Sequence, residues 1–169
     1  MEVSRIYFDM DGVLADFERG IREICGVEPI PQGDSRDQEK EDKMWNLVKE
    51  AGHFYDMLEF MPGAEELFDT VYGKYGDKCE ILSGIPKARR GIDSAADDKT
   101  NWIRRLLSKD IKMNLVYRRD KVGFCHGEGD ILIDDYEKNI KEWNENGGTG
   151  ILHTGAEETL NKLKELGIL

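Results

Sequence analysis

Two aspartates stand near the start of the chain, where a short apolar run gives way to polar residues. Asp9 and Asp11 follow the run Arg5–Phe8, and because one residue separates them, both carboxylates can face the same side of an extended chain. Gly12 permits a sharp backbone turn directly after the pair. Two carboxylates at one strand end are costly unless a cation joins them, and a hard ion such as Mg²⁺ suits oxygen ligands. The pair therefore indicates a cation site that also holds an oxygen nucleophile.

A second acidic pair, Asp134 and Asp135, follows the apolar run Ile131–Ile133 and could supply the remaining cation ligands. Taken alone, such a pair often marks only the start of a helix. Its place at another strand end makes it the expected counterpart of the first pair.

Neutral and basic groups complete the set that phosphoryl transfer uses. Ser83 and the backbone N–H of Gly84 could hold phosphate oxygens, and Lys99 and Lys121 could offset the phosphate charge. Each of these residues alone has an ordinary explanation as a turn or a solvated charge. Their occurrence in one order, together with the two acidic pairs, makes the combination far more specific.

Short apolar runs alternate with segments of helical periodicity, and these are the elements that must position the groups above. The predicted strands are 5–8, 79–82, 113–117, 131–133 and 150–153, and helices are expected after 62–63, over 97–107, near 136–143 and over 156–166. Such alternation favours a parallel sheet with helices on both faces, where ligands bind beyond the carboxyl ends of the strands. The charged segment Pro29–Lys43 is predicted to be a solvated loop that leads into a helix.

The composition excludes several classes of protein. Hydrophobic residues make up 39% and charged residues 35% of the 169 positions, as in folded globular domains. A net charge of −11 disfavours binding of polymeric nucleic acid, and no apolar run is long enough to span a membrane. The amino-terminal residues lack the pattern of a signal peptide. Three scattered cysteines argue against a disulfide scaffold and favour a reducing, cytoplasmic location.

The motifs, taken together, resemble those of the haloacid dehalogenase-like superfamily. The run from Phe8 to Phe17 is similar to its first motif, Ser83 stands at its second, Lys121 at its third, and the run Ile131–Asp135 at its fourth. The resemblance implies a Rossmann-like parallel sheet flanked by helices.

Within that superfamily, the chain resembles the 5'(3')-deoxyribonucleotidases, also known as cytosolic type C 5'-nucleotidases. The similarity lies in Asp11–Phe17, in Phe54-Tyr55 followed by Pro62-Gly63, in Ser83–Lys87, and in Asp98-Lys99 with Trp102. It implies a core domain formed by residues 1–17 and 61–169, with a small helical cap over 18–60 inserted after the first strand.

The resemblance also implies a mechanism. Asp9 would attack phosphorus to form an aspartyl-phosphate, and Asp11 would act as general acid and then as general base. Mg²⁺ would be bound by Asp9, the backbone carbonyl of Asp11, and Asp134, with Asp135 in support. Ser83, Gly84, Lys121 and Lys99 would bind the phosphate. Aromatic side chains would stack on the base of a nucleoside monophosphate, and the matching candidates are Phe17, Trp45, Phe54 and Tyr55.

Alternatives stay open. A receiver-like signalling module also combines a phospho-accepting aspartate with an acidic pair and a lysine, but its acidic pair comes first in the chain, whereas here the spaced pair comes first. Another phosphomonoester, such as a phosphosugar, could be the substrate. The function of segment 29–43, the base or sugar preference and the oligomeric state, a homodimer included, are not determined by the sequence.

Overall fold

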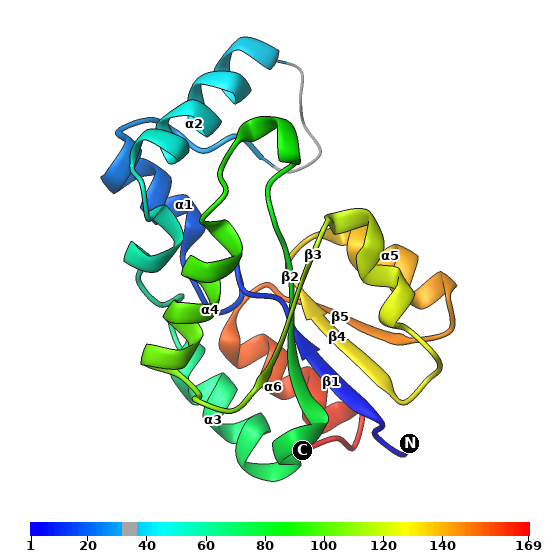
Figure 1. Ribbon diagram of the computed structural model, residues 1–169. Helices are drawn as coiled ribbons and strands as arrows, with labels where there is room; N and C mark the ends of the chain where they lie inside the picture. Colours follow the sequence, from blue (N-terminus) through cyan, green and yellow to red (C-terminus); the bar gives the residue numbers. More distant parts are fainter. Residues whose placement is uncertain (32–36) are drawn as a thin grey trace.

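A five-stranded parallel sheet forms the centre of the computed structural model, which describes residues 1–31 and 37–169 (Figure 1). Its strand order is β3-β2-β1-β4-β5. The strands are β1 (Arg5–Phe8), β2 (Cys79–Gly84), β3 (Lys112–Val116), β4 (Asp130–Asp134) and β5 (Thr149–Leu152). All four neighbouring pairs are parallel. The predicted α/β, Rossmann-like fold is confirmed.

Side chains on the two faces of the sheet pack against different helices. On β1, Ile6 and Phe8 belong to the larger apolar core, whereas Tyr7 points to the other face and packs with Leu132 and Trp143. Because both faces are covered, the strands consist of nearly continuous apolar runs instead of alternating ones. The helices that cover the sheet are α3 (Ala64–Tyr75), α4 (Ala95–Leu106) and α6 (Ala156–Glu165) on one face and α5 (Glu137–Glu145) on the other.

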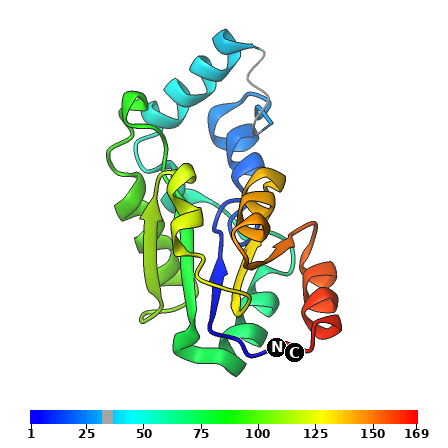
Figure 2. The same cartoon turned by 90° about the vertical axis from the view of Figure 1, so that its right-hand side faces the viewer.

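The segment between β1 and α3 lies beyond the carboxyl ends of the strands (Figures 1 and 2). It contains α1 (Phe17–Gly20), a π-helical turn (Ile21–Cys25), α2 (Gln38–Glu50) and a 3₁₀ turn (Phe54–Met57). Met44, Val48 and Phe54 from this segment belong to the same apolar core as β1. The division into a core of 1–17 and 61–169 and a cap of 18–60 stays a prediction.

Several element boundaries differ from the expectation by one or more residues, and two of these differences concern α2 and β2. Helix α2 begins at Gln38, well before the apolar stripe at Met44, because the Asp37 side chain accepts a hydrogen bond from the Lys40 N–H at 3.0 Å and caps the helix. Much of the charged run is therefore the solvated side of a helix, while residues 32–36 of the segment 29–43 lie outside the described residues. Strand β2 continues through Ser83 and Gly84, which pair with β3.

Within the described ranges, no helix is both long enough and apolar enough to cross a membrane.

Candidate active site

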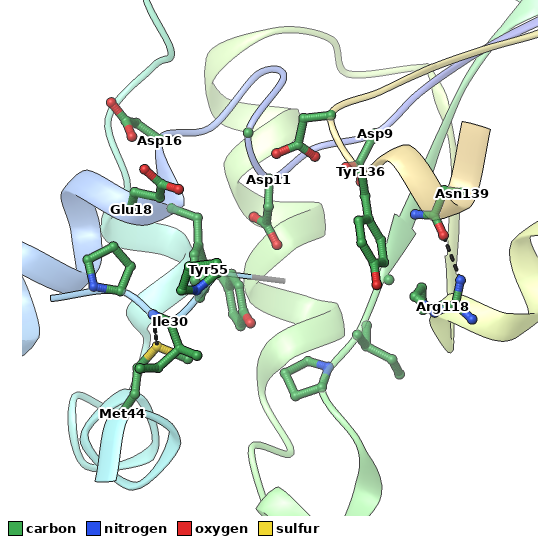
Figure 3. Close-up of a pocket in the computed structure, with 18 of the residues that line it drawn as sticks. Asp9, Asp11, Asp16, Glu18, Ile30, Met44, Tyr55, Arg118, Tyr136 and Asn139 are labelled. Carbon is green, nitrogen blue, oxygen red and sulfur yellow. Dashed lines mark hydrogen bonds between the residues drawn. The ribbon is translucent and has the colours of Figure 1, made fainter. Parts of the chain in front are cut away.

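The predicted site residues converge because their strands are neighbours. Strand β1 lies between β2 and β4, so the loops that leave these three parallel strands meet at one edge of the sheet. They line a cavity of about 690 Å³ that also touches the segment between β1 and α3. Figure 3 shows Asp9 and Asp11 between one wall with Tyr55 and Met44 and an opposite wall with Tyr136.

Three carboxylates gather at one side of this cavity. Asp9, Asp134 and Asp135 each offer an oxygen within 4.8 Å of the others, and they are the only such group of possible metal ligands among the residues described. Asp9 and Asp134 are buried, whereas Asp135 is exposed. Burial, then the negative charge of Asp134, raises the pKa of Asp9 well above its ordinary value. Such a cluster of hard oxygen ligands requires positive charge.

The buried ammonium group of Lys121 supplies part of that charge. Its Nζ donates hydrogen bonds to Asp9 Oδ1 at 3.0 Å and to Asp134 Oδ2 at 2.9 Å. Burial alone would lower the pKa of Lys121, but the two carboxylates outweigh that effect and raise it. One ammonium cannot neutralise three carboxylates, so the site still favours a cation.

Asp11 has a different partner, Lys99. The fully buried Lys99 Nζ donates to Asp11 Oδ2 at 2.8 Å, to Ser83 Oγ at 2.9 Å and to the Gly84 carbonyl at 2.7 Å. These three bonds use all three N–H donors of the ammonium group. Lys99 therefore holds Asp11 in place, and no donor is left for a phosphate oxygen in this arrangement. The other Asp11 oxygen, Oδ1, is buried without a hydrogen-bond partner.

The turn after Asp11 depends on a glycine. Gly12 has a φ of +80°, and a Cβ at this position would lie 2.0 Å from Asp135 Oδ2. Glycine is thus required both for the backbone conformation and for the close approach of the second acidic pair. Packing around the carboxylate, then Asp134 and Asp11, raises the pKa of Asp135 to about 7.

The four predicted aromatic residues form one cluster but differ in their access to the cavity. Phe17 contacts Trp45, Phe54 and Tyr55 with ring centroids 5.6–6.2 Å apart. Phe17, Trp45 and Tyr55 line the cavity, whereas Phe54 is buried behind them and does not. The Tyr55 ring is 2% exposed, with Lys99 Nζ 4.6 Å from its centroid. Phe17 and Trp45 are thus both cavity-lining and partly exposed, whereas Tyr55 lines the cavity but is almost fully buried, and Phe54 is packed in the core.

Sequence reasoning missed a residue that fixes Asp134. The buried Asn139, on α5, donates from Nδ2 to Asp134 Oδ2 at 3.0 Å and accepts from Arg118 Nη1 at 2.9 Å (Figure 3). The Tyr136 N–H donates to Asp134 Oδ1 at 2.9 Å. The only signal in the sequence is the spacing of Asn139 from Asp134 across a helix start. Nothing local distinguishes it from a solvated helical asparagine.

The comparisons with known proteins confirm the predicted family resemblance. The protein-family model described as "5' nucleotidase, deoxy (Pyrimidine), cytosolic type C protein" matches residues 3–161. A protein of Vibrio phage KVP40, described as "Putative 5'(3')-deoxyribonucleotidase", is 31% identical over 135 residues, which are 79% of this chain and 67% of the phage protein.

Solved structures support the fold. A haloacid dehalogenase-family hydrolase from Deinococcus radiodurans R1, with bound phosphate and sodium, superposes with a TM-score of 0.62 at 15% identity, covering 99% of this chain and 97% of its own. A hydrolase from Streptococcus pneumoniae TIGR4 superposes with a TM-score of 0.51 at 12% identity, and the superposition covers 99% of this chain and 100% of that hydrolase.

Proposed function

This chain belongs to the family of cytosolic type C 5'-nucleotidases, and we propose that it is a magnesium-dependent phosphomonoester hydrolase acting on nucleoside monophosphates, as a 5'(3')-deoxyribonucleotidase. The observation that carries the proposal is the placement of Asp9 and Asp11 in one cavity, between a carboxylate cluster and a wall that includes Phe17 and Trp45. The carboxylates suit phosphoryl transfer, and the aromatic wall suits a planar base.

The residues present fit a magnesium ion. Asp9, Asp134 and Asp135 offer the oxygen ligands that Mg²⁺ prefers, and their mutual repulsion is relieved only in part by Lys121. The backbone carbonyl of Asp11 is the further proposed ligand. When bound, Mg²⁺ supplies positive charge beside the nucleophile and the transferring phosphoryl group.

Asp9 is proposed to form and then release a covalent intermediate. Its Oδ1 accepts hydrogen bonds from the Met10 N–H at 2.9 Å and from Lys121, so Oδ2 is the oxygen available for attack. Oδ2 bonds to phosphorus as the bond from phosphorus to the ester oxygen breaks, and Asp11 gives its proton to the leaving alkoxide. Asp11 then takes a proton from water, which attacks the aspartyl-phosphate and releases inorganic phosphate and Asp9.

The neighbouring basic and polar residues divide into two roles in this proposal. Lys121 and Gly84 both line the cavity, and Lys121 is proposed to offset phosphate charge. Lys99 instead orients Asp11, because its three donors are occupied within the protein. Ser83 accepts from Lys99, but its side chain is fully buried and is not among the residues that line the cavity, so its contact with phosphate stays a prediction.

The test is phosphate release from a panel of nucleoside monophosphates and phosphosugars, with Mg²⁺ and with EDTA, for wild type and Asp9→Asn. We expect turnover that requires Mg²⁺, is abolished in Asp9→Asn, and is fastest with deoxynucleotides. If a phosphosugar is hydrolysed fastest, the proposed phosphatase mechanism stands, but the assignment as a nucleotidase is rejected. Full activity of Asp9→Asn would reject the nucleophile, and a receiver-like module would take up one phosphoryl group without turnover.

A further inference from the structure

An arginine outside the carboxylate cluster joins the two walls of the cavity. Arg90 Nη1 lies 2.6 Å from Asp42 Oδ1, and Nη2 lies 3.4 Å from Glu41 Oε1. The Arg90 side chain is only 8% exposed. One guanidinium group therefore bridges two carboxylates on α2, which a lysine ammonium cannot do with the same planar geometry.

On one side of this bridge is the loop that follows β2. Arg90 ends the 3₁₀ turn Ala88–Arg90, and its N–H donates to the Lys87 carbonyl at 2.9 Å. The same loop begins after Gly84, the last residue of β2, and lines the cavity through Lys87. In both cartoon views the green turn after β2 lies beside the cyan helix α2 (Figures 1 and 2). The bridge is thus anchored in the loop that directly follows Ser83 and Gly84, the proposed phosphate-binding residues at the end of β2.

On the other side is the helix that contributes the aromatic wall. Trp45 follows Glu41 by four residues and Asp42 by three, so all three lie on neighbouring positions of one helical surface. Trp45, Met44 and Glu41 line the cavity. Among the residues that the structure describes, Glu41 Oε2 is buried without a hydrogen-bond partner, and Arg90 places positive charge beside the other oxygen of this carboxylate.

Two further contacts join the other end of the α2 segment to a different helix. Ser94 Oγ donates to the Gly52 carbonyl at 3.1 Å, and His53 Nδ1 lies 2.9 Å from Asp98 Oδ1. These contacts join the carboxyl end of the α2 segment to the start of α4, far from the cavity-lining turn of α2. Among the described residues, Arg90 is therefore the ionic contact that joins the cavity-lining part of α2 to the loop after β2.

We propose that Arg90 is a positioning residue that couples α2 to the loop after β2, so that contacts between α2 and the nucleoside base increase the rate of phosphoryl transfer. This inference rests on the proposed nucleotidase function. Binding energy from a non-reacting part of a substrate raises kcat when it is used to position the reacting groups. Without Arg90, the base still contacts Trp45, but that contact no longer orders the loop after β2.

The experiment compares a deoxynucleoside 5'-monophosphate with deoxyribose 5-phosphate, which has the same leaving oxygen but no base. We expect wild type to show a higher kcat for the nucleotide. In Arg90→Ala the nucleotide kcat should fall about tenfold or more, toward that of deoxyribose 5-phosphate, whose own kcat changes little. Arg90→Lys keeps the positive charge but loses the planar guanidinium group that contacts both carboxylates. It should give an intermediate ratio of the nucleotide kcat to the deoxyribose 5-phosphate kcat, and it replaces Arg90→Ala as the test variant if Arg90→Ala does not fold.

Two controls make the result specific. Arg89 is the exposed neighbour and forms no ion pair within the described part of the chain, so Arg89→Ala should leave the ratio unchanged. The double variant Arg90→Asp/Asp42→Arg, which exchanges the two charges, should recover part of the kcat ratio that is lost in Arg90→Ala. An equal fall for both substrates, or an unchanged ratio in Arg90→Ala, would overturn the coupling. Equal turnover of the two substrates by wild type would instead overturn the nucleotidase function on which it rests.

Discussion

Lys121 Nζ lies 3.0 Å from Asp9 Oδ1, although 112 positions separate the two residues in the chain. The contact places a buried cation against the proposed nucleophile. Lys121 lowers the pKa of Asp9, but burial and the negative charge of Asp134 outweigh it, so the pKa of Asp9 in the metal-free protein still lies well above its ordinary value.

Replacing Lys121 by methionine should damage both activity and stability. Two buried carboxylates lose their shared partner, which at sites of this kind costs about 3–5 kcal/mol, and kcat should fall about 10²–10³-fold. Urea denaturation and phosphate release measure the two effects. Adding Asp9→Asn to Lys121→Met should recover part of the stability and none of the activity. Equal stability of the single and double variants would contradict the charge-pairing explanation.

The free energy of unfolding of the metal-free protein should depend on pH through Asp135. Its folded pKa of about 7 lies above the unfolded value of about 3.9, so the folded state binds the extra proton between them. Stability from this group is therefore present at low pH and is lost as the pH rises from about 4 to about 7. Solvent screening at this exposed side chain reduces the size of the effect.

Urea denaturation in EDTA from pH 4 to 8, for wild type and Asp135→Asn, measures this contribution. The variant should show a shallower loss of stability with rising pH, and Mg²⁺ should stabilise wild type more than the variant at pH 8. Identical slopes would mean that Asp135 does not titrate in this range.

Substitution of Lys99 by methionine should affect the leaving-group step more than phosphate binding. If Lys99 orients Asp11, the variant loses proton donation to an alkoxide leaving group, worth about 10²–10⁴-fold. A nitrophenyl leaving group needs little protonation, so its release should be slowed far less. The measurement is kcat for a nucleoside monophosphate and for nitrophenyl phosphate. Equal losses for both substrates would favour direct contact between Lys99 and phosphate.

Gly12 and Gly26 form a matched pair for testing the turn after Asp11. Both have positive φ, +80° and +69°, but a Cβ at Gly12 would collide with Asp135, whereas one at Gly26 would meet no atom of the described residues within 4 Å. Each alanine substitution should cost about 1–2 kcal/mol from backbone conformation alone. Only Gly12→Ala should also weaken the Mg²⁺-induced rise in melting temperature. A similar loss in Gly26→Ala would exclude the collision as the cause.

The aromatic cluster should separate into substrate-contacting and structural residues. Trp45→Leu should raise KM for a nucleotide about tenfold and leave deoxyribose 5-phosphate unaffected, because each aromatic contact with a base is worth about 1–3 kcal/mol in known nucleic-acid sites. Phe54→Leu should instead lower the melting temperature by a few degrees without changing substrate preference, since its ring is buried in the core. A change of preference in Phe54→Leu would contradict this division.

The sequence by itself determined the fold class and the position of the acidic pairs. Apolar runs of strand length, separated by segments of helical periodicity, allow few arrangements other than a parallel sheet, and the parallel sheet brings the carboxyl ends of its strands to one edge. Asp9 directly follows β1, and Asp134 is the last residue of β4. Their side chains could therefore be predicted to lie close together.

Only the tertiary structure decided which partner each charged group has. Lys99 and Lys121 are indistinguishable as cations in the sequence, yet one holds Asp11 and the other bridges Asp9 and Asp134. The same is true of Asn139, which fixes Asp134. The physical reason is that these hydrogen bonds depend on distances of a few ångströms between distant segments, and periodicity and residue type carry no information at that scale.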